Sequence, residues 1–423
     1  MPAPPDNTSN LSAIAARLRT ALLRESIALV DSGSATPAAV DTLVRTTIGR
    51  RLSVAGPFEI WEQIGWDLVQ VIAGELLKDL SNATDVSPSF DACLDHTDGG
   101  PPLPVLAADT TTTDAISHVA VIGAGLMGHG IALEFAASGR SVRLHDLSPA
   151  LLADALTRAE VGLRTLAGSG RISDADAEAA LGRISTTTNV ADCVRAADLV
   201  IEAASENLDL KKRIFEQLDT LAPARAILAS NTSTFLPSAY AASTRRPEQV
   251  IGTHYYNPPH LLPGLEIIRG PATSDRTAAT IGALFESIGK QPALLDREIQ
   301  GFIGNRLQVA LLREATSVVE GGLATAAEVD QLVRTTFGRD LASAGPFTLA
   351  RRAGLETTRA VLMHNLPLLS NRRTVPELVL QKVASGALGV KAGRGFYDWT
   401  PESAEAWRAH MADSLLGIEA HQP

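Results

Sequence analysis

Three glycines with a fixed spacing give the clearest chemical signal in the sequence. The segment Gly123-Ala-Gly125-Leu-Met-Gly128 follows the apolar run HVAVI and precedes the amphipathic stretch MGHGIALEFAASG. Gly123 permits a tight turn, Gly125 lets a pyrophosphate approach the backbone, and Gly128 lets a helix pack closely on a strand. The free N–H groups at the start of such a helix favour an anion. The pattern predicts a dinucleotide site whose turn includes Leu126 and Met127; the alternative is a tight strand–helix turn without a ligand.

An acidic residue at the end of the next predicted strand narrows the choice of cofactor. Asp146 directly follows the run SVRLH at residues 141–145. A carboxylate at this place accepts hydrogen bonds from both ribose hydroxyls and repels a 2′-phosphate. The sequence therefore predicts NAD rather than NADP as the cofactor.

Polar residues that suit hydride transfer occur in four segments downstream of the glycines. Hydride transfer from a secondary alcohol to a nicotinamide requires a base for the hydroxyl proton, and histidine suits this role at neutral pH. His254 in GTHYYNPP is the candidate base, and Glu266 in LEII is the candidate carboxylate that orients its ring. Ser233 in ASNTST and Asn305 in GFIGNRL can hold the substrate oxygen by hydrogen bonds. Each residue alone could be structural, but an acid in an apolar strand is unfavourable without a partner, which favours the pair.

The elements that must position these residues alternate between strands and helices over about residues 116–297. Strands are predicted for short β-branched runs, at residues 118–122, 141–145, 199–201 and 226–229. Helices are predicted for amphipathic stretches, at residues 127–138, 150–166 and 209–221. This alternation implies an α/β fold, in which helices cover both faces of a parallel sheet.

Residues 17–58 and 306–347 are two copies of one segment. They align without a gap, and 26 of the 42 aligned residues are identical. Apolar residues recur at three- and four-residue spacings in the second copy, which predicts an amphipathic helix. Thr325 followed by Glu328 predicts a capping box for the next helix, whereas the first copy lacks the acid at the equivalent position. Both copies are therefore expected to be all-α.

This organisation divides the chain into a helical N-terminal repeat, a linker, an NAD-binding domain, a helical C-terminal domain and a tail. We place these parts at residues 1–94, 95–114, 115–297, 298–401 and 402–423. The linker carries Gly-Gly, three prolines and a threonine run, a composition typical of extended or mobile segments.

The composition excludes several other classes of function. Lys plus Arg is 37 and Asp plus Glu is 47, a net charge of −10, so no basic excess exists to neutralise nucleic-acid phosphates. Two cysteines are too few for a disulfide-stabilised fold of this length, and the nine histidines show no spacing typical of metal ligands. No apolar run approaches the roughly 18 residues of a membrane span. We expect a reducing, cytoplasmic compartment, with the N-terminal arginines in the folded repeat rather than in a transit peptide.

The chain from about residue 116 to residue 400 resembles the L-3-hydroxyacyl-CoA dehydrogenase family. The resemblance rests on VIGAGLMGHGIA, DLVIEAASENLDLKKRIFEQLD, ASNTS, HYYNP, LEII, GFIGNRL and GRGFYDW, which occur in this order. It implies a Rossmann-like NAD-binding domain followed by an all-α domain of the 6-phosphogluconate-dehydrogenase-like type, with the substrate between them. It also implies interconversion of L-3-hydroxyacyl-CoA and 3-oxoacyl-CoA, as in fatty acid β-oxidation.

The resemblance assigns roles to single residues as well. His254 would be the general base and Glu266 its partner, while Ser233 and Asn305 would contact the substrate oxygen. Two residues of the segment ENLDLK would lie near the nicotinamide half of the cofactor, namely Glu206 and Lys211.

Two departures from the family pattern leave the substrate open. The segment HYYNPPHLLP, which includes the proposed base, resembles relatives that oxidise free 3-hydroxy acids as well as some acyl-CoA members. Where relatives that bind CoA often have a lysine-rich helix, this chain has only Arg158, Arg164 and Arg171. They are either phosphate contacts, because arginine binds phosphate bidentately, or solvated helix charges. The substrate is accordingly an acyl-CoA or a free or carrier-bound 3-hydroxy acid; a non-catalytic NAD-binding protein is the third alternative.

The N-terminal copy is a further departure. Its Ala16 aligns with Asn305, while the apolar and turn residues of the repeat are kept. This pattern predicts a packing module rather than a second active site. We expect residues 1–94 to pack against the C-terminal helical domain, either as an intrachain pseudo-dimer or across a homodimer; the alternative is a tethered module that binds another protein.

Overall fold

The computed structural model describes residues 7–87, 116–346, 349, 353 and 355–420, and the chain forms two compact units. One unit comprises residues 101–300, and the other comprises residues 1–100 together with 301–423. The expected linker at 95–114 lies outside the described residues. Among those that are described, no helix is both long enough and apolar enough to cross a membrane.

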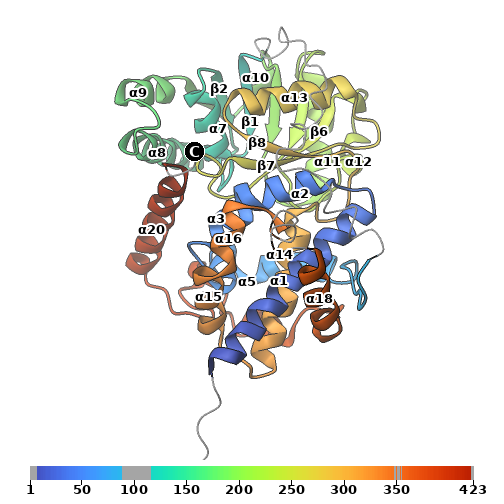
Figure 1. Ribbon diagram of the computed structural model, residues 1–423. Helices are drawn as coiled ribbons and strands as arrows, with labels where there is room; N and C mark the ends of the chain where they lie inside the picture. Colours follow the sequence, from blue (N-terminus) through green and yellow to red (C-terminus); the bar gives the residue numbers. More distant parts are fainter. Residues whose placement is uncertain (1–6, 88–115, 347–348, 350–352, 354, 421–423) are drawn as a thin grey trace, which may run out of the picture. The chain divides into compact units, whose positions relative to one another are not determined.

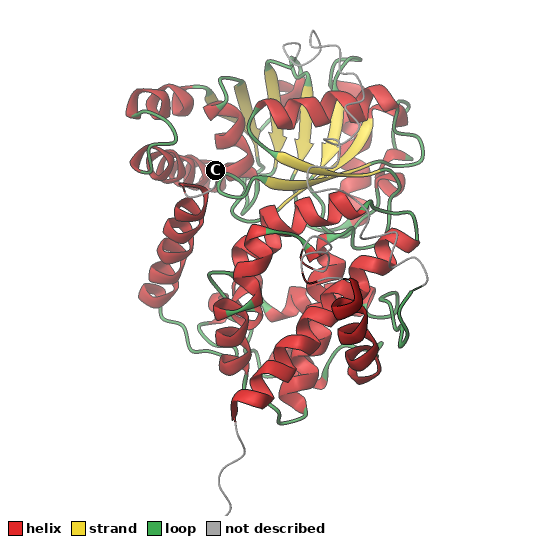
Figure 2. Cartoon of the chain, viewed as in Figure 1, coloured by secondary structure: helices red, strands yellow, loops and turns green. Residues whose placement is uncertain are grey.

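The α/β unit is built on one eight-stranded sheet with the strand order β3-β2-β1-β4-β5-β6-β7-β8, shown in yellow in Figure 2. Neighbours from β3 to β6 are parallel, β7 runs antiparallel to β6, and β8 is parallel to β7. The strands are β1 (His118–Ile122), β2 (Ser141–His145), β3 (Ile184–Thr187), β4 (Leu199–Glu202), β5 (Ile227–Ser230), β6 (Val250–Tyr255), β7 (Gly264–Ile268) and β8 (Gln291–Leu295).

Helices cover both faces of this sheet because the buried strand residues alternate between two cores. Val119 and Val121 of β1 belong to one core, and Ala120 and Ile122 belong to the other. The helices are α7 (Gly128–Ala137), α8 (Pro149–Gly168), α9 (Asp174–Gly182), α10 (Val190–Val194), α11 (Leu208–Leu221), α12 (Pro237–Ala241) and α13 (Asp275–Ser287). The predicted α/β class is confirmed, and the predicted strands and helices appear with ends within two residues of those expected.

The described part of the second unit consists of helices and loops, with two isolated β-bridges between residues 389 and 398 and no β-strand. Its N-terminal segment forms α1 (Asn7–Asp31), α2 (Pro37–Leu43), the π-helix Val44–Ile48, α3 (Gly49–Leu52), α4 (Pro57–Ile64) and α5 (Trp66–Leu76). Its C-terminal segment forms α14 (Gly304–Glu320), α15 (Ala326–Thr335), α16 (Phe337–Ser343), α18 (Leu355–Asn365), α19 (Glu377–Ala384) and α20 (Pro401–Ala420). The predicted capping box of Thr325 and Glu328 begins α15. Most of the expected tail from residue 402 lies in α20.

Helices α1 and α14 contact one another within the helical unit and lie side by side in Figure 1. Arg17 pairs with Glu314 at 2.6 Å, and Arg306 pairs with Glu25 at 2.6 Å. In the aligned copies Arg17 corresponds to Arg306 and Glu25 corresponds to Glu314. Each copy therefore supplies the same arginine and the same glutamate to the other, as in an isologous interface.

The short helices that follow show the same reciprocity. A Cβ atom added to Gly49 would lie 2.2 Å from the carbonyl oxygen of Leu341, and one added to Gly338 would lie 2.3 Å from that of Leu52. Gly49 and Gly338 are equivalent in the two copies, as are Leu52 and Leu341. The backbones of α3 and α16 thus approach each other too closely for any side chain at these two glycines.

Candidate functional site

The glycine-rich turn joins β1 to α7 in the geometry that a dinucleotide requires. Gly123 has a φ of 107°, and a Cβ atom there would lie 2.5 Å from the carbonyl oxygen of Ala203. A Cβ atom on Gly128 would lie 1.8 Å from the carbonyl oxygen of Gly123. Around Gly125, by contrast, an added Cβ atom would meet nothing within 4 Å. The turn is therefore closed where it packs on the protein and open at the glycine expected to approach a pyrophosphate.

Asp146 stands beside this turn at the end of β2. Its carboxylate accepts hydrogen bonds from the backbone N–H groups of Ala124 and Ser148, both at 3.0 Å. Leu126 is 62% exposed at the tip of the turn, and Met127 precedes α7 and packs partly against the sheet core. These positions agree with the expected ribose and pyrophosphate contacts, which remain predictions for the individual residues.

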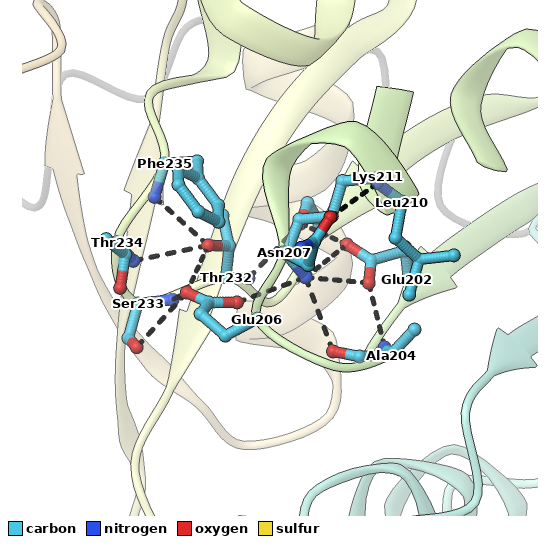
Figure 3. A network of polar contacts seen from close by, with 11 residues as sticks. Glu202, Ala204, Glu206, Asn207, Leu210, Lys211, Thr232, Ser233, Thr234 and Phe235 are labelled. Carbon is cyan, nitrogen blue, oxygen red and sulfur yellow. Dashed lines mark hydrogen bonds and ion pairs between the residues drawn. The ribbon is translucent and has the colours of Figure 1, made fainter. Parts of the chain in front are cut away.

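A buried lysine and two glutamates lie at the carboxyl ends of β4 and β5 (Figure 3). The Nζ atom of Lys211 is 2.8 Å from Oε1 of Glu202 and 3.1 Å from Oε2 of Glu206. The side chains of Lys211 and Glu202 are 1% and 0% exposed. Ser230 donates a hydrogen bond to Glu202 at 2.5 Å. Lys211 is thus held between two carboxylates, one at the end of β4 and one in the segment that follows it.

Glu206 connects this network to the serine that was predicted to contact substrate. The hydroxyl of Thr232 donates a hydrogen bond to Oε1 of Glu206, and the backbone N–H of Ser233 lies 3.0 Å from the same oxygen. Burial by itself raises the pKa of the Glu206 carboxyl, but Lys211 and the hydrogen bond from Thr232 outweigh burial, so that the pKa lies below its ordinary value. Glu206 is therefore a carboxylate at neutral pH, with Ser233 and Lys211 fixed on either side of it.

The proposed base and its partner face each other across β6 and β7. His254 and Glu266 are register partners in this antiparallel pair, and Nδ1 of the imidazole lies 2.6 Å from Oε2 of the carboxylate. Their side chains are 7% and 0% exposed. The hydroxyl of Tyr256 donates a second hydrogen bond to Oε2 at 2.7 Å. With its proton on Nδ1, a neutral imidazole carries its lone pair on Nε2, the nitrogen that can take up a proton.

Asn305 belongs to the helical unit, where it lies at the start of α14 and is 8% exposed. The other predicted catalytic residues, Ser233, His254 and Glu266, belong to the α/β unit. The role of Asn305 beside the substrate oxygen therefore remains a prediction.

The three arginines proposed as phosphate contacts have different surroundings. Arg158 donates to the carbonyl oxygens of Ala124 at 3.0 Å and Gly125 at 3.3 Å, so it contacts the glycine-rich turn itself. Arg164 pairs with Glu160 on the same helix, and its side chain is 77% exposed. Arg171 is only partly buried. A phosphate contact remains a prediction for all three, while Arg158 has a second role as a support of the turn.

Two residues of the site were not singled out by the sequence analysis. Glu202 ends an apolar strand, which is the same signal that identified Glu266, and it is followed nine residues later by Lys211. Tyr256 lies two residues after His254 and was treated only as part of a motif. In the described part of the chain, no group of three or more His, Cys, Asp or Glu side chains could hold a metal ion.

Two known family domains match most of the residues of both units. Residues 118–299 match the NAD binding domain of 3-hydroxyacyl-CoA dehydrogenase. Residues 14–96 and residues 301–399 both match the C-terminal domain of 3-hydroxyacyl-CoA dehydrogenase.

Individual relatives include enzymes that act on different substrates. A 5-formyl-3-hydroxy-2-methylpyridine 4-carboxylate 5-dehydrogenase from Mesorhizobium japonicum is 35% identical over 72% of this chain and 97% of its own length. A probable 3-hydroxybutyryl-CoA dehydrogenase from Bacillus subtilis is 35% identical over 68% of this chain and 99% of its own length.

The solved structures that resemble this chain include the same two kinds of enzyme. A crystal structure of 5-formyl-3-hydroxy-2-methylpyridine 4-carboxylic acid 5-dehydrogenase, an NAD+-dependent dismutase, covers 72% of this chain and 97% of its own with a TM-score of 0.68. The structure of (S)-3-hydroxybutyryl-CoA dehydrogenase from Ralstonia eutropha is 36% identical and covers 67% of this chain and 99% of its own, with a TM-score of 0.56.

Proposed function

This chain belongs to the 3-hydroxyacyl-CoA dehydrogenase family, an NAD-dependent group of oxidoreductases, and we propose that it interconverts L-3-hydroxyacyl-CoA and 3-oxoacyl-CoA with His254 as the general base. The observation that carries this proposal is the buried hydrogen bond of 2.6 Å between His254 and Glu266. A buried carboxylate on Nδ1 fixes the orientation of the imidazole and stabilises the imidazolium that forms when Nε2 takes a proton.

NAD fits the residues that are present. The turn of Gly123, Gly125 and Gly128 leaves open space at Gly125 only, and the N–H groups at the start of α7 favour an anionic pyrophosphate. Asp146 would hold the ribose hydroxyls, and Glu206 with Lys211 would lie near the nicotinamide half. The bound nicotinamide supplies a hydride acceptor in the oxidative direction.

In that direction the substrate loses a proton from its 3-hydroxyl group and a hydride from the carbon that carries this group. His254 takes the hydroxyl proton on Nε2, the C–H bond is broken as its electron pair leaves with hydride, and a C=O bond forms. Ser233 and Asn305 would donate hydrogen bonds to the substrate oxygen, and Glu266 would balance the charge on the imidazolium. In the reductive direction the same imidazolium returns the proton.

A free 3-hydroxy acid is the second candidate substrate, and two observations favour it. The relative from Mesorhizobium japonicum is named for a pyridine carboxylate rather than for a thioester. Arg158 is one of the three proposed phosphate contacts, but both of its terminal nitrogens donate hydrogen bonds to the carbonyl oxygens of Ala124 and Gly125. A carrier-bound acid remains a variant of this candidate.

The substrate experiment is NADH oxidation followed by absorbance, with acetoacetyl-CoA and separately with free acetoacetate. Rapid turnover of the thioester alone supports the acyl-CoA assignment. Turnover of the free acid alone contradicts it and supports the second candidate. If NADH binds while neither compound reacts, the proposal moves to another 3-hydroxy acid or a carrier-bound one as the substrate.

We also propose that the helical unit is an intrachain pseudo-dimer. The reciprocal pairs Arg17–Glu314 and Arg306–Glu25 support this proposal, as does the match of both segments to the same family domain. Because the N-terminal copy already covers this face of the C-terminal copy, the face should not be available to bind a second chain. Light scattering should therefore give the mass of one chain; a homodimer that dissociates when Glu25 or Arg306 is changed would contradict the proposal.

A further inference from the structure

A connection of eight residues joins β6 and β7, the strands that carry His254 and Glu266, and it is too long to fix their pairing by its own turn geometry. β6 ends at Tyr255 and β7 begins at Gly264, so residues 256–263 join the two strands. Hairpin loops that fix strand register by their own turn geometry usually have about two to five residues. Contacts from elsewhere in the unit must therefore hold this connection in place.

Lys290, just before β8, supplies these contacts. Its Nζ atom donates to the carbonyl oxygen of Pro259 at 2.6 Å and to that of Leu262 at 2.7 Å, and it lies 2.5 Å from Oε1 of Glu134. The side chains of Lys290 and Glu134 are 4% and 11% exposed. An ammonium group has three N–H donors, so all three have acceptors, and two of these acceptors are backbone atoms of the connection.

Other bonds fix the two ends of the same connection. The backbone N–H of Gln291 donates to the carbonyl oxygen of Pro263 at 2.8 Å. The backbone N–H of Tyr255 donates to Oδ1 of Asn231 at 2.9 Å, and Nζ of Lys290 lies 5.3 Å from the centre of the Tyr255 ring. The residue next to His254 thus contacts Asn231, which directly follows β5, and Lys290.

Stability alone does not account for a buried ion pair at this place. Replacing such a pair by apolar residues of similar volume is often neutral or stabilising, because desolvation offsets the attraction of the charges. An apolar side chain at position 290 could not, however, donate to the carbonyl oxygens of Pro259 and Leu262. Glu134 also lies on α7, the helix that begins at the glycine-rich turn, so Lys290 links the connection to the cofactor helix.

We propose that Lys290 is a positioning residue for the His254–Glu266 pair, acting through the carbonyl oxygens of Pro259 and Leu262, with Glu134 as its counter-ion. The proposal rests on the proposed role of His254. Lys290 sets where the imidazole stands relative to α7 and does not itself contact the reacting atoms. Its loss should reduce turnover while leaving the affinity for NADH almost unchanged.

The test compares Lys290→Met with the double variant Lys290→Met/Glu134→Met. The single variant leaves Glu134 buried without its cation and should lower Tm, whereas the double variant removes both charges and should recover most of the Tm. In both variants kcat for acetoacetyl-CoA reduction should fall about tenfold or more, because a displacement of the order of 1 Å disrupts a reacting geometry. The Kd of NADH should stay within about twofold of the wild-type value in both.

The matched control is Lys382→Met in the helical unit. Lys382 also donates to a backbone carbonyl, that of Gly395 at 2.6 Å, and it lies 4.5 Å from the centre of the Phe396 ring. Its loss should leave kcat within about twofold of wild type, since its contacts with Gly395 and Phe396 lie in the helical unit and not in the connection between β6 and β7.

A second measurement keeps the test independent of substrate identity. The Nδ1 proton of an imidazole in a short hydrogen bond to a carboxylate gives a proton NMR resonance far downfield of the amides. We expect this resonance of His254 in the wild type and in Lys382→Met, and its displacement or loss in both Lys290 variants. It is observed without turnover, so failure of the proposed substrate would not be mistaken for failure of the positioning role.

Two results would overturn the inference. If kcat recovers together with Tm in the double variant, Lys290 serves stability only. If the resonance is unchanged in both Lys290 variants, the carbonyl contacts do not position His254. Should the single variant fail to fold, the double variant and its resonance decide between these outcomes.

Discussion

Glu266 lies directly opposite His254 in the antiparallel pair of β6 and β7, with its carboxylate oxygen 2.6 Å from Nδ1 of the imidazole. Because the two residues are register partners, the strand pairing itself brings base and carboxylate together. Replacing Glu266 by Gln keeps the size of the side chain but removes the charge that stabilises the imidazolium. We expect kcat to fall by at least about tenfold with NADH affinity unchanged. A variant with wild-type kcat would show that the carboxylate has no role in catalysis.

Arg158 should matter for the cofactor more than its neighbour Arg164 does. Arg158 donates to the carbonyl oxygens of Ala124 and Gly125 in the glycine-rich turn, whereas Arg164 pairs with Glu160 on an exposed face of α8. Arg158→Ala should raise the Kd of NADH about tenfold, the equivalent of one lost charged hydrogen bond of about 1.4 kcal/mol. Arg164→Ala is the matched control and should leave it unchanged. Equal effects of the two substitutions in a fluorescence titration would contradict the supporting role of Arg158.

His260 should make the α/β unit less stable in acid. Burial first, and then the cations His129, Lys290 and Arg171, lower the pKa of His260 to about 3. In the unfolded chain the imidazole of His260 takes up a proton near pH 6.5. The contribution of neutral His260 to the free energy of unfolding is therefore fully present above pH 6.5 and is lost as the pH falls toward about 3. The expected loss between pH 7 and pH 5 is about 2 kcal/mol of the free energy of unfolding from this residue.

The variant His260→Asn tests this acid sensitivity. Urea unfolding followed by circular dichroism at pH 7 and pH 5 should show a smaller difference in the variant than in the wild type. An identical difference in both proteins would mean that His260 is protonated as readily in the folded state as in the unfolded one.

The two copies of the repeat should depend on each other for stability. Glu25→Gln leaves Arg306 buried without its carboxylate and should cost about 3 kcal/mol of the free energy of unfolding. The control Arg19→Ala breaks the ion pair with Asp340, in which both side chains are about half exposed, and should cost at most about 1 kcal/mol. All four tryptophans, Trp61, Trp66, Trp399 and Trp407, lie in the helical unit, so tryptophan fluorescence follows its unfolding. If Glu25→Gln and Arg19→Ala lowered the free energy of unfolding by the same small amount, the two copies would not depend on each other through the pair of Glu25 and Arg306.

The parts of the site that could be predicted from the sequence are those whose signal is local. The glycine spacing predicts the turn because Gly123 and Gly128 make backbone contacts too close for a side chain, whereas Gly125 faces open space. His254 and Glu266 were predicted by residue type and by resemblance. The helical class of the second unit was predicted from the three- and four-residue spacing of apolar residues in one copy, and it was extended to the other copy because 26 of the 42 aligned residues are identical.

The parts that could not be predicted depend on which strands become neighbours. Lys290 meets Glu134 and the connection at Pro259 only because β8 pairs with β7 at the end of the sheet order. No periodicity in the sequence indicates this contact. Arg158 presented the same difficulty, because a helix arginine looks solvated until the fold places it against the carbonyl oxygens of the turn.

Turnover of His254→Ala is the most direct test of the central claim that this chain is an NAD-dependent dehydrogenase with a histidine base. NADH oxidation by a substrate that the wild type uses should fall by about 10²–10⁴-fold, while a fluorescence titration should show that NADH binds as tightly as before. A fall of only a few-fold, with NADH binding intact, would contradict the assignment of His254 as the base.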